Sequence, residues 1–173
     1  NKKKPFQTWD DFGFKGVSFK VVLISILIGL VVFILNIFIS TFFSYILSMF
    51  GYRTASSAGG EQTWGTFFFS LFSVAVLPAI CEEFTHRGML LSSYKKLGFK
   101  KAVLLTGLMF GLIHLNIGQF FYATIIGVVL AVVALYSRSI VPGIIIHFMN
   151  NAINVYLDFA QSKGIFGANF YSN

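Results

Sequence analysis

The sequence is poor in charge, in cysteine and in proline. Charged residues make up 11% of its 173 residues, and only six of them are Asp or Glu, whereas 56% of the chain is hydrophobic. A soluble domain carries roughly 25% charged residues, so the composition excludes an ordinary soluble protein. The single cysteine, Cys81, excludes an internal disulfide, and we expect it to be a small buried apolar side chain.

The longest stretch without a charged residue runs from Val21 to Tyr52. It is well beyond the roughly 20 residues that a membrane-spanning helix needs. The sequence contains five apolar segments, at residues 21–49, 64–80, 102–115, 120–136 and 140–157. They predict an all-α fold, a polytopic transmembrane helical bundle with about five spans. We expect an interfacial N-terminal segment at residues 1–20 on the cytosolic side, a helical core at 21–160 and a C-terminal tail at 161–173.

The net charge of +7 follows the expected topology. Alternate threading of the five segments gathers most basic residues on one side: Lys2, Lys3, Lys4, Lys15, Lys20, Lys95, Lys96, Lys100, Lys101 and Arg138. Only Arg53 and Lys163 fall opposite, so the positive-inside rule predicts a multi-pass cell-membrane protein with a cytoplasmic N-terminus. The Phe- and Ile-rich composition with short loops favours a bacterial source. Nucleic-acid binding is not expected, because the basic residues flank membrane segments.

Ionisable residues gather at the end of the second apolar segment, at Glu82, Glu83 and Arg87. Each costs roughly 2.5–3.5 kcal/mol in a membrane helix unless it is paired or faces water. The i, i+4 spacing of Glu83 and Arg87 predicts an ion pair. Glu82 projects about 100° away and is left for a cavity, where a carboxylate can take a proton from water. A charge network or a cation path is the alternative interpretation of the two carboxylates.

Two histidines lie on later segments. His114 and Glu82 are equally distant along the chain from the expected turn at Gly98, so antiparallel helices would place them at one depth. His147 begins a polar stripe at helical spacing, formed with Asn151, Asn154 and Asp158, and we expect that stripe to face inward.

Two further features concern helix geometry. Gly107 and Gly111 lie on the face of the third segment that carries His114, and they predict close approach of another helix. Pro78, four residues before Glu82, predicts a kink because it cannot donate a backbone hydrogen bond.

These side chains suit the hydrolysis of a peptide bond by water. Glu82, aided by His114, would deprotonate the attacking water. His147 and Asn151 would donate hydrogen bonds to the oxyanion, at about 2.7–4 kcal/mol for each donor.

The ordered motifs Glu82-Glu83-xxx-Arg87, Phe110-xxx-His114 and His147-xxx-Asn151 resemble the three signatures of the CAAX protease and bacteriocin-processing family. This family of intramembrane proteases is also called the Abi or type II CAAX prenyl endopeptidase family. The resemblance runs from about residue 74 to residue 154. It implies that Glu82 is the base, that Glu83 and Arg87 support it, that His114 assists, and that His147 with Asn151 forms the oxyanion site.

The sequence departs from the family at His86, where an aromatic residue is usual. His86 could tune Glu82, join a metal site or form a polar edge of the cavity. Glu82, His114 and His147 would also make a His₂Glu zinc set. We favour a mechanism without a metal cofactor, since the polar residues suffice for it and no His-Glu-x-x-His helix is present.

We therefore expect an intramembrane endopeptidase that cuts a membrane-associated peptide or protein near the cytoplasmic face. The resemblance implies substrates such as bacteriocin or pheromone precursors, self-immunity targets or prenylated C-terminal tails. Two alternatives stay open. One is a non-catalytic membrane scaffold or immunity factor that binds a partner, and the other is an ion or proton path.

Overall fold

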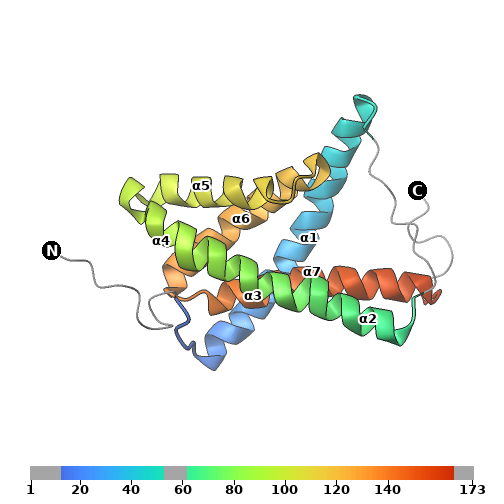
Figure 1. The fold of residues 1–173 in the computed structure, drawn as a ribbon, viewed down its shortest axis with the longest axis horizontal. Helices are drawn as coiled ribbons and strands as arrows, with labels where there is room; N and C mark the ends of the chain where they lie inside the picture. Colours follow the sequence, from blue (N-terminus) through green and yellow to red (C-terminus); the bar gives the residue numbers. More distant parts are fainter. Residues whose placement is uncertain (1–12, 53–61, 166–173) are drawn as a thin grey trace.

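The computed structural model describes residues 13–52 and 62–165, and within them the chain forms five helical rods (Figure 1). The rods are α1 (Phe19–Met49), a continuous helical stretch (Trp64–Leu97), α5 (Phe99–Leu112), α6 (Ile117–Ser137) and α7 (Val141–Ser162). The described residues contain no strand, and the predicted all-α helical bundle is confirmed. Among them, α1, the 64–97 stretch and α6 are long and apolar enough to cross a membrane.

The 64–97 stretch is not a uniform α-helix. It consists of α2 (Trp64–Ser70), the π-helical η2 (Leu71–Val76), α3 (Leu77–Glu83), the π-helical η3 (Phe84–Leu90), α4 (Leu91–Tyr94) and the 3₁₀-helical η4 (Lys95–Leu97). Pro78 stands in the first turn of α3, so its missing N–H falls directly after η2. The sequence predicts a kink at Pro78, and the structure has a π-helical stretch just before that residue. Such stretches are frequent at functional sites.

The helix α5 begins and ends three residues earlier than the apolar segment expected at residues 102–115. It has 14 residues and ends at Leu112, so His114 lies in the turn after the helix and not within a span. Fourteen residues rise only about 21 Å, which is less than the hydrocarbon thickness of a bilayer. The hairpin before α5 turns at Gly98, whose φ of 86° is favourable only for glycine.

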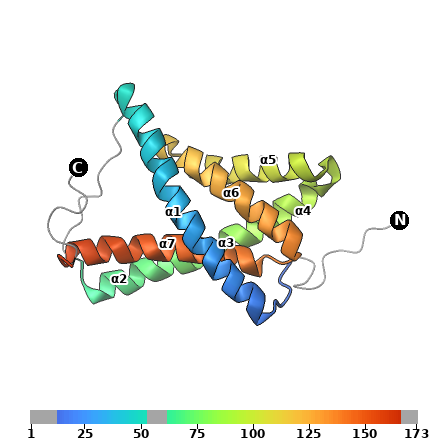
Figure 2. The same ribbon diagram turned by 180° about the vertical axis from the view of Figure 1, so that it is seen from behind.

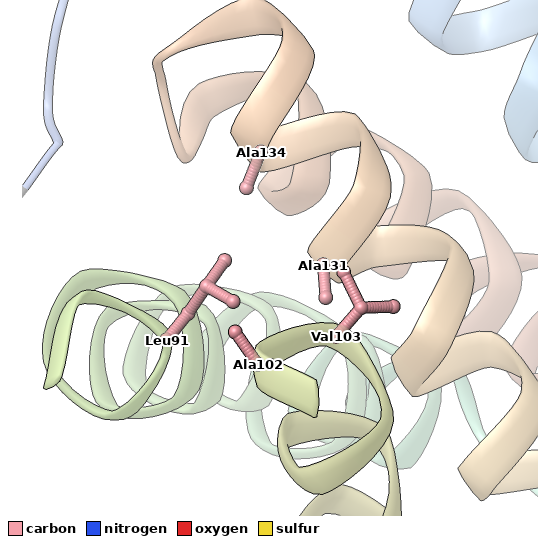
Figure 3. Packing of buried hydrophobic residues seen from close by; sticks show 5 residues of the cluster. All are labelled: Leu91, Ala102, Val103, Ala131 and Ala134. Atoms are coloured by element: carbon pink, nitrogen blue, oxygen red, sulfur yellow. The ribbon is translucent and has the colours of Figure 1, made fainter. Parts of the chain in front are cut away.

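The helices α5 and α6 touch through glycine. A Cβ on Gly107 would lie 3.0 Å from the Thr124 carbonyl oxygen, and one on Gly111 would lie 2.7 Å from the Phe120 carbonyl oxygen. The predicted close approach at these two glycines is therefore confirmed, and the partner is α6. Where α4, α5 and α6 meet, a small apolar cluster is buried (Figure 3), formed by Leu91, Ala102, Val103, Ala131 and Ala134.

The helix α1 crosses α6 and α7, and α7 lies alongside the first half of the 64–97 stretch (Figures 1 and 2). Large apolar side chains on the outer faces stay uncovered, such as Phe38 at 70% exposure and Phe69 at 71%. Those faces suit contact with lipid, because water would disfavour so much apolar surface.

The prediction that Cys81 is buried is wrong, since its side chain is exposed. Adjacent helical residues point about 100° apart, and the inward direction at this point is taken by Glu82 and Glu83. The residues Lys2, Lys3, Lys4 and Arg53, and most of the expected interfacial segment and C-terminal tail, lie outside the described residues.

Candidate active site

A fully buried carboxylate, Glu83, joins two other helices. Its Oε1 accepts a hydrogen bond from Arg87 Nη1 at 2.7 Å, in the ion pair that the i, i+4 spacing predicts, and both side chains are 0% exposed. The same oxygen lies 3.2 Å from His147 Nδ1 on α7. A Cβ on Gly143 would lie 2.6 Å from Glu83 Oε2, so α7 can pass this close only with glycine at that position.

Arg87 extends this buried cluster to a third helix. Its Nη2 donates to the Gly127 carbonyl of α6 at 2.9 Å. Its guanidinium carbon lies 4.6 Å from the centre of the Phe110 ring. The cluster of Glu83, Arg87 and His147 therefore ties η3, α6 and α7 together, and the side chains of Glu83 and Arg87 are fully buried within it.

Phe110 is the centre about which the three histidines are arranged. Its ring is 3% exposed and makes edge-to-face contacts with His86 at 5.1 Å, His114 at 5.3 Å and His147 at 5.5 Å. Aromatic rings prefer this arrangement, and packing of this kind limits the rotation of all three imidazoles.

Glu82 faces a cavity of about 520 Å³. His114, His147 and Asn151 line the same cavity, together with Asn154 and Asp158. The polar stripe of α7 therefore faces inward, as predicted, and all five rods contribute residues to this one chamber. Glu82 Oε2 is buried and has no hydrogen-bond partner, in contrast to the neighbouring Glu83 Oε1.

His86 does not line that cavity. Its Nδ1 lies 2.9 Å from the Glu82 carbonyl oxygen, and its ring packs on Phe110. His86 therefore contacts a residue of the chamber wall, Phe110, and is not itself among the lining residues; its supporting role stays a prediction. His114 is held in a similar way, with Nδ1 2.8 Å from the Phe110 carbonyl oxygen.

Asn151 belongs to a chain of amide hydrogen bonds that the sequence did not reveal. Asn36 Nδ2 of α1 donates to Asn150 Oδ1 at 3.1 Å, and Asn150 Nδ2 donates to Asn151 Oδ1 at 3.2 Å. Asn151 Nδ2 then donates to the Val74 carbonyl in η2 at 2.9 Å. That carbonyl is the one to which Pro78 cannot donate in an α-helix. The chain therefore fixes the Asn151 amide from both ends.

Asn36 and Asn150 also line the cavity and are buried, so they belong to the site although we did not predict them. A signal was present, because Asn36 is the only amide side chain between Val21 and Tyr52. An amide side chain in an apolar membrane segment usually finds a partner on another helix.

The side chains do not fit the alternative zinc set. Within residues 13–52 and 62–165, no three His, Cys, Asp or Glu side chains come close enough together to hold one metal ion. His147 Nδ1 is turned to Glu83, so Nε2 is the ring nitrogen that remains for another partner.

A family model described as type II CAAX prenyl endopeptidase Rce1-like matches residues 64–153. No curated protein and no solved structure matches the chain. The matched range contains Glu82, His114, His147 and Asn151, whose catalytic roles remain predictions. It leaves out α1, which supplies Asn36 to the cavity.

Proposed function

Because the chain belongs to the Rce1-like family of type II CAAX prenyl endopeptidases, which are intramembrane proteases, we propose that it hydrolyses a peptide bond of a membrane-associated substrate by glutamate-activated water. The observation that carries the proposal is the shared cavity lined by Glu82, His114 and His147. Glu83 is held by Arg87 and His147, so Glu82 is the carboxylate that is left to act on water.

Glu82 takes a proton from a water molecule while the water oxygen attacks the scissile carbonyl carbon. The carbon–nitrogen bond then breaks, and Glu82 returns the proton to the leaving nitrogen, which restores the carboxylate. His114 assists by orienting the water. Its Nδ1 faces the Phe110 carbonyl and must carry hydrogen there, so its Nε2 is a hydrogen-bond acceptor in the neutral ring.

The oxyanion is stabilised from α7. Asn151 donates one amide hydrogen to the Val74 carbonyl and has its second available for the oxyanion. His147 Nδ1 faces a carboxylate, which only accepts, so Nε2 donates when the ring carries two protons. Loss of either donor would reduce the rate by about 10²–10³-fold.

The substrate proposed is a peptide or protein already held in the membrane, such as a bacteriocin or pheromone precursor. The protein would be a multi-pass protein of a bacterial cell membrane with its N-terminus in the cytoplasm and cleavage near that face. Support for this orientation comes from Lys15, Lys95 and Arg138, which lie around one cavity although they come from three separate segments.

The test is cleavage of membrane-anchored peptides by the purified protein in lipid vesicles, followed by mass spectrometry. We expect the E82Q variant to lose about 10²–10⁴-fold in rate. The matched control is D158N, which also changes a carboxylate of the same cavity to an amide and should stay within a few-fold of the parent protein. A parallel reaction with a chelator tests metal dependence, and we expect no change in rate.

The result that would overturn the proposal is equal cleavage by the parent protein and the E82Q variant. Full biological activity of E82Q without cleavage would favour the scaffold interpretation. Ion flux through the vesicles without cleavage would favour the ion or proton path.

A further inference from the structure

A second cavity, of about 450 Å³, lies where the N-terminal segment, the 64–97 stretch and the turn between α6 and α7 meet. No residue lines both this cavity and the one that contains Glu82. Its size falls within the roughly 300–1,000 Å³ typical of small-molecule sites. The proposed peptidase chemistry does not use it.

The backbone around this cavity is fixed by hydrogen bonds. The Ile140 N–H donates to the Gly13 carbonyl at 2.8 Å, and Ser139 Oγ donates to the Lys15 carbonyl at 2.7 Å. Arg138 ends α6 in the left-handed conformation, with φ of 55°. The segments that carry Lys15 and Arg138 are therefore joined to each other by hydrogen bonds.

Part of the wall is apolar. Leu91 and Ala134 line the cavity, and Figure 3 shows their side chains facing one another between α4 and α6. An apolar wall lowers the local dielectric constant, so the field of nearby charges is concentrated there.

The charge of the cavity is of one sign. Lys15, Lys95, Arg138 and Arg87 line it, and no carboxylate does. In the described part of the chain, none of the first three makes an ion pair. Arg87 uses Nη1 for Glu83 and Nη2 for Gly127, while its Nε is buried without a hydrogen-bond partner. The cavity thus offers cations and lacks an anion.

We propose that this cavity binds a phosphate group, carried by an anionic phospholipid headgroup or by a soluble phosphate compound. Phosphate fits better than a single carboxylate, because several cations surround a space larger than a carboxylate needs. Basic pockets between membrane helices are suited to such headgroups. Arg87 links this cavity to Glu83 and hence to the first cavity, so occupancy would also stabilise the buried cluster.

The lipid test uses the protein in nanodiscs with phosphatidylglycerol or with phosphatidylcholine, and counts retained lipids by native mass spectrometry. The soluble test titrates glycerol phosphate and inorganic phosphate in detergent and follows the apparent melting temperature. Retained phosphatidylglycerol without a response to the soluble compounds identifies a headgroup site, and the opposite result identifies a soluble ligand.

The variant combines K15Q, K95Q and R138N, because Asn tolerates the left-handed conformation at that position. We expect it to lose affinity on the order of 100-fold, since each of the three cations contributes about fivefold. The matched control combines K20Q, K100Q and K101Q, which removes the same charge from exposed lysines that do not line the cavity. The control should bind as the parent protein does.

An equal loss of affinity in the triple variant and in its control would overturn the proposal, because net charge alone would then explain binding. Absence of binding to every probe would overturn it as well. If the triple variant unfolds, the single K95Q variant replaces it, with an expected loss of about fivefold. Peptide cleavage is not the readout, so failure here is distinguishable from failure of the peptidase proposal.

Discussion

The replacement of Glu83 by Gln tests whether the buried cluster stabilises the helical bundle. Glu83 and Arg87 are both 0% exposed, and Glu83 Oε1 has partners at 2.7 Å and 3.2 Å. The E83Q side chain has nearly the same shape but no charge. It leaves the Arg87 guanidinium buried without a counter-ion, and the cost of breaking a buried pair in this way is about 3–5 kcal/mol.

That cost can be converted into a melting temperature. For a chain of this size, 1 kcal/mol corresponds to roughly 2–4 °C, so we expect the E83Q variant to melt about 6–20 °C below the parent protein. The measurement is a dye-based thermal shift in detergent, at one scan rate, because helical membrane proteins commonly unfold irreversibly.

The neighbouring E82Q variant is the control for this measurement. It makes the same chemical change one residue away, but Glu82 Oε2 has no hydrogen-bond partner and no ion pair. We expect a shift within about 2 °C, as for substitutions that break no buried interaction. The pair of variants thus separates stability, for which we expect Glu83 to matter, from cleavage, for which we propose Glu82.

A double variant tests the physical reason. If the cost comes from an uncompensated charge, adding R87M to E83Q should recover part of the lost stability, because the buried cation is then absent. A shift below about 2 °C for E83Q, or equal shifts for E83Q and E82Q, would refute the assignment of the buried pair to stability.

Three more predictions concern two residues that line the cavity containing Glu82 and one glycine of the α5–α6 contact. N36L breaks the amide chain to Asn150 and should lower the cleavage rate about fivefold or more with little change in melting temperature; an unchanged rate would show that the chain does not position the site. G111A places a Cβ 2.7 Å from the Phe120 carbonyl and should destabilise the protein by about 1–3 kcal/mol, which thermal shift would detect. F110L removes the ring that three histidines contact and should reduce the rate more than the stability, as judged by parallel cleavage and melting measurements.

Much of the site could be read from spacing along one helix. The Glu83–Arg87 ion pair follows from i, i+4 geometry, and the inward stripe of α7 follows from helical periodicity. The approach of a helix to Gly107 and Gly111 likewise follows from the absence of a Cβ. Each of these features depends on neighbours within a few residues, so the sequence alone could predict it.

Three features required the assembled structure. Asn36 meets Asn150 across 114 positions of sequence, and no local pattern specifies such a pairing. His86, in the π-helical stretch Phe84–Leu90, packs on Phe110 of α5, a contact between helices that periodicity along one helix does not specify. The early end of α5 at Leu112 likewise moves His114 into a turn.

Composition and short-range spacing were enough to predict an apolar helical bundle, and the three ordered motifs suggested the protease family by resemblance, which the family-model match confirms. Only the packing of the helices brought His147 of α7 to Glu83, across 64 positions of sequence. It also gathered Lys15, Lys95 and Arg138 around one space. The physical reason is that burial and partner choice depend on contacts between helices distant in sequence, which are set only when the rods pack against each other.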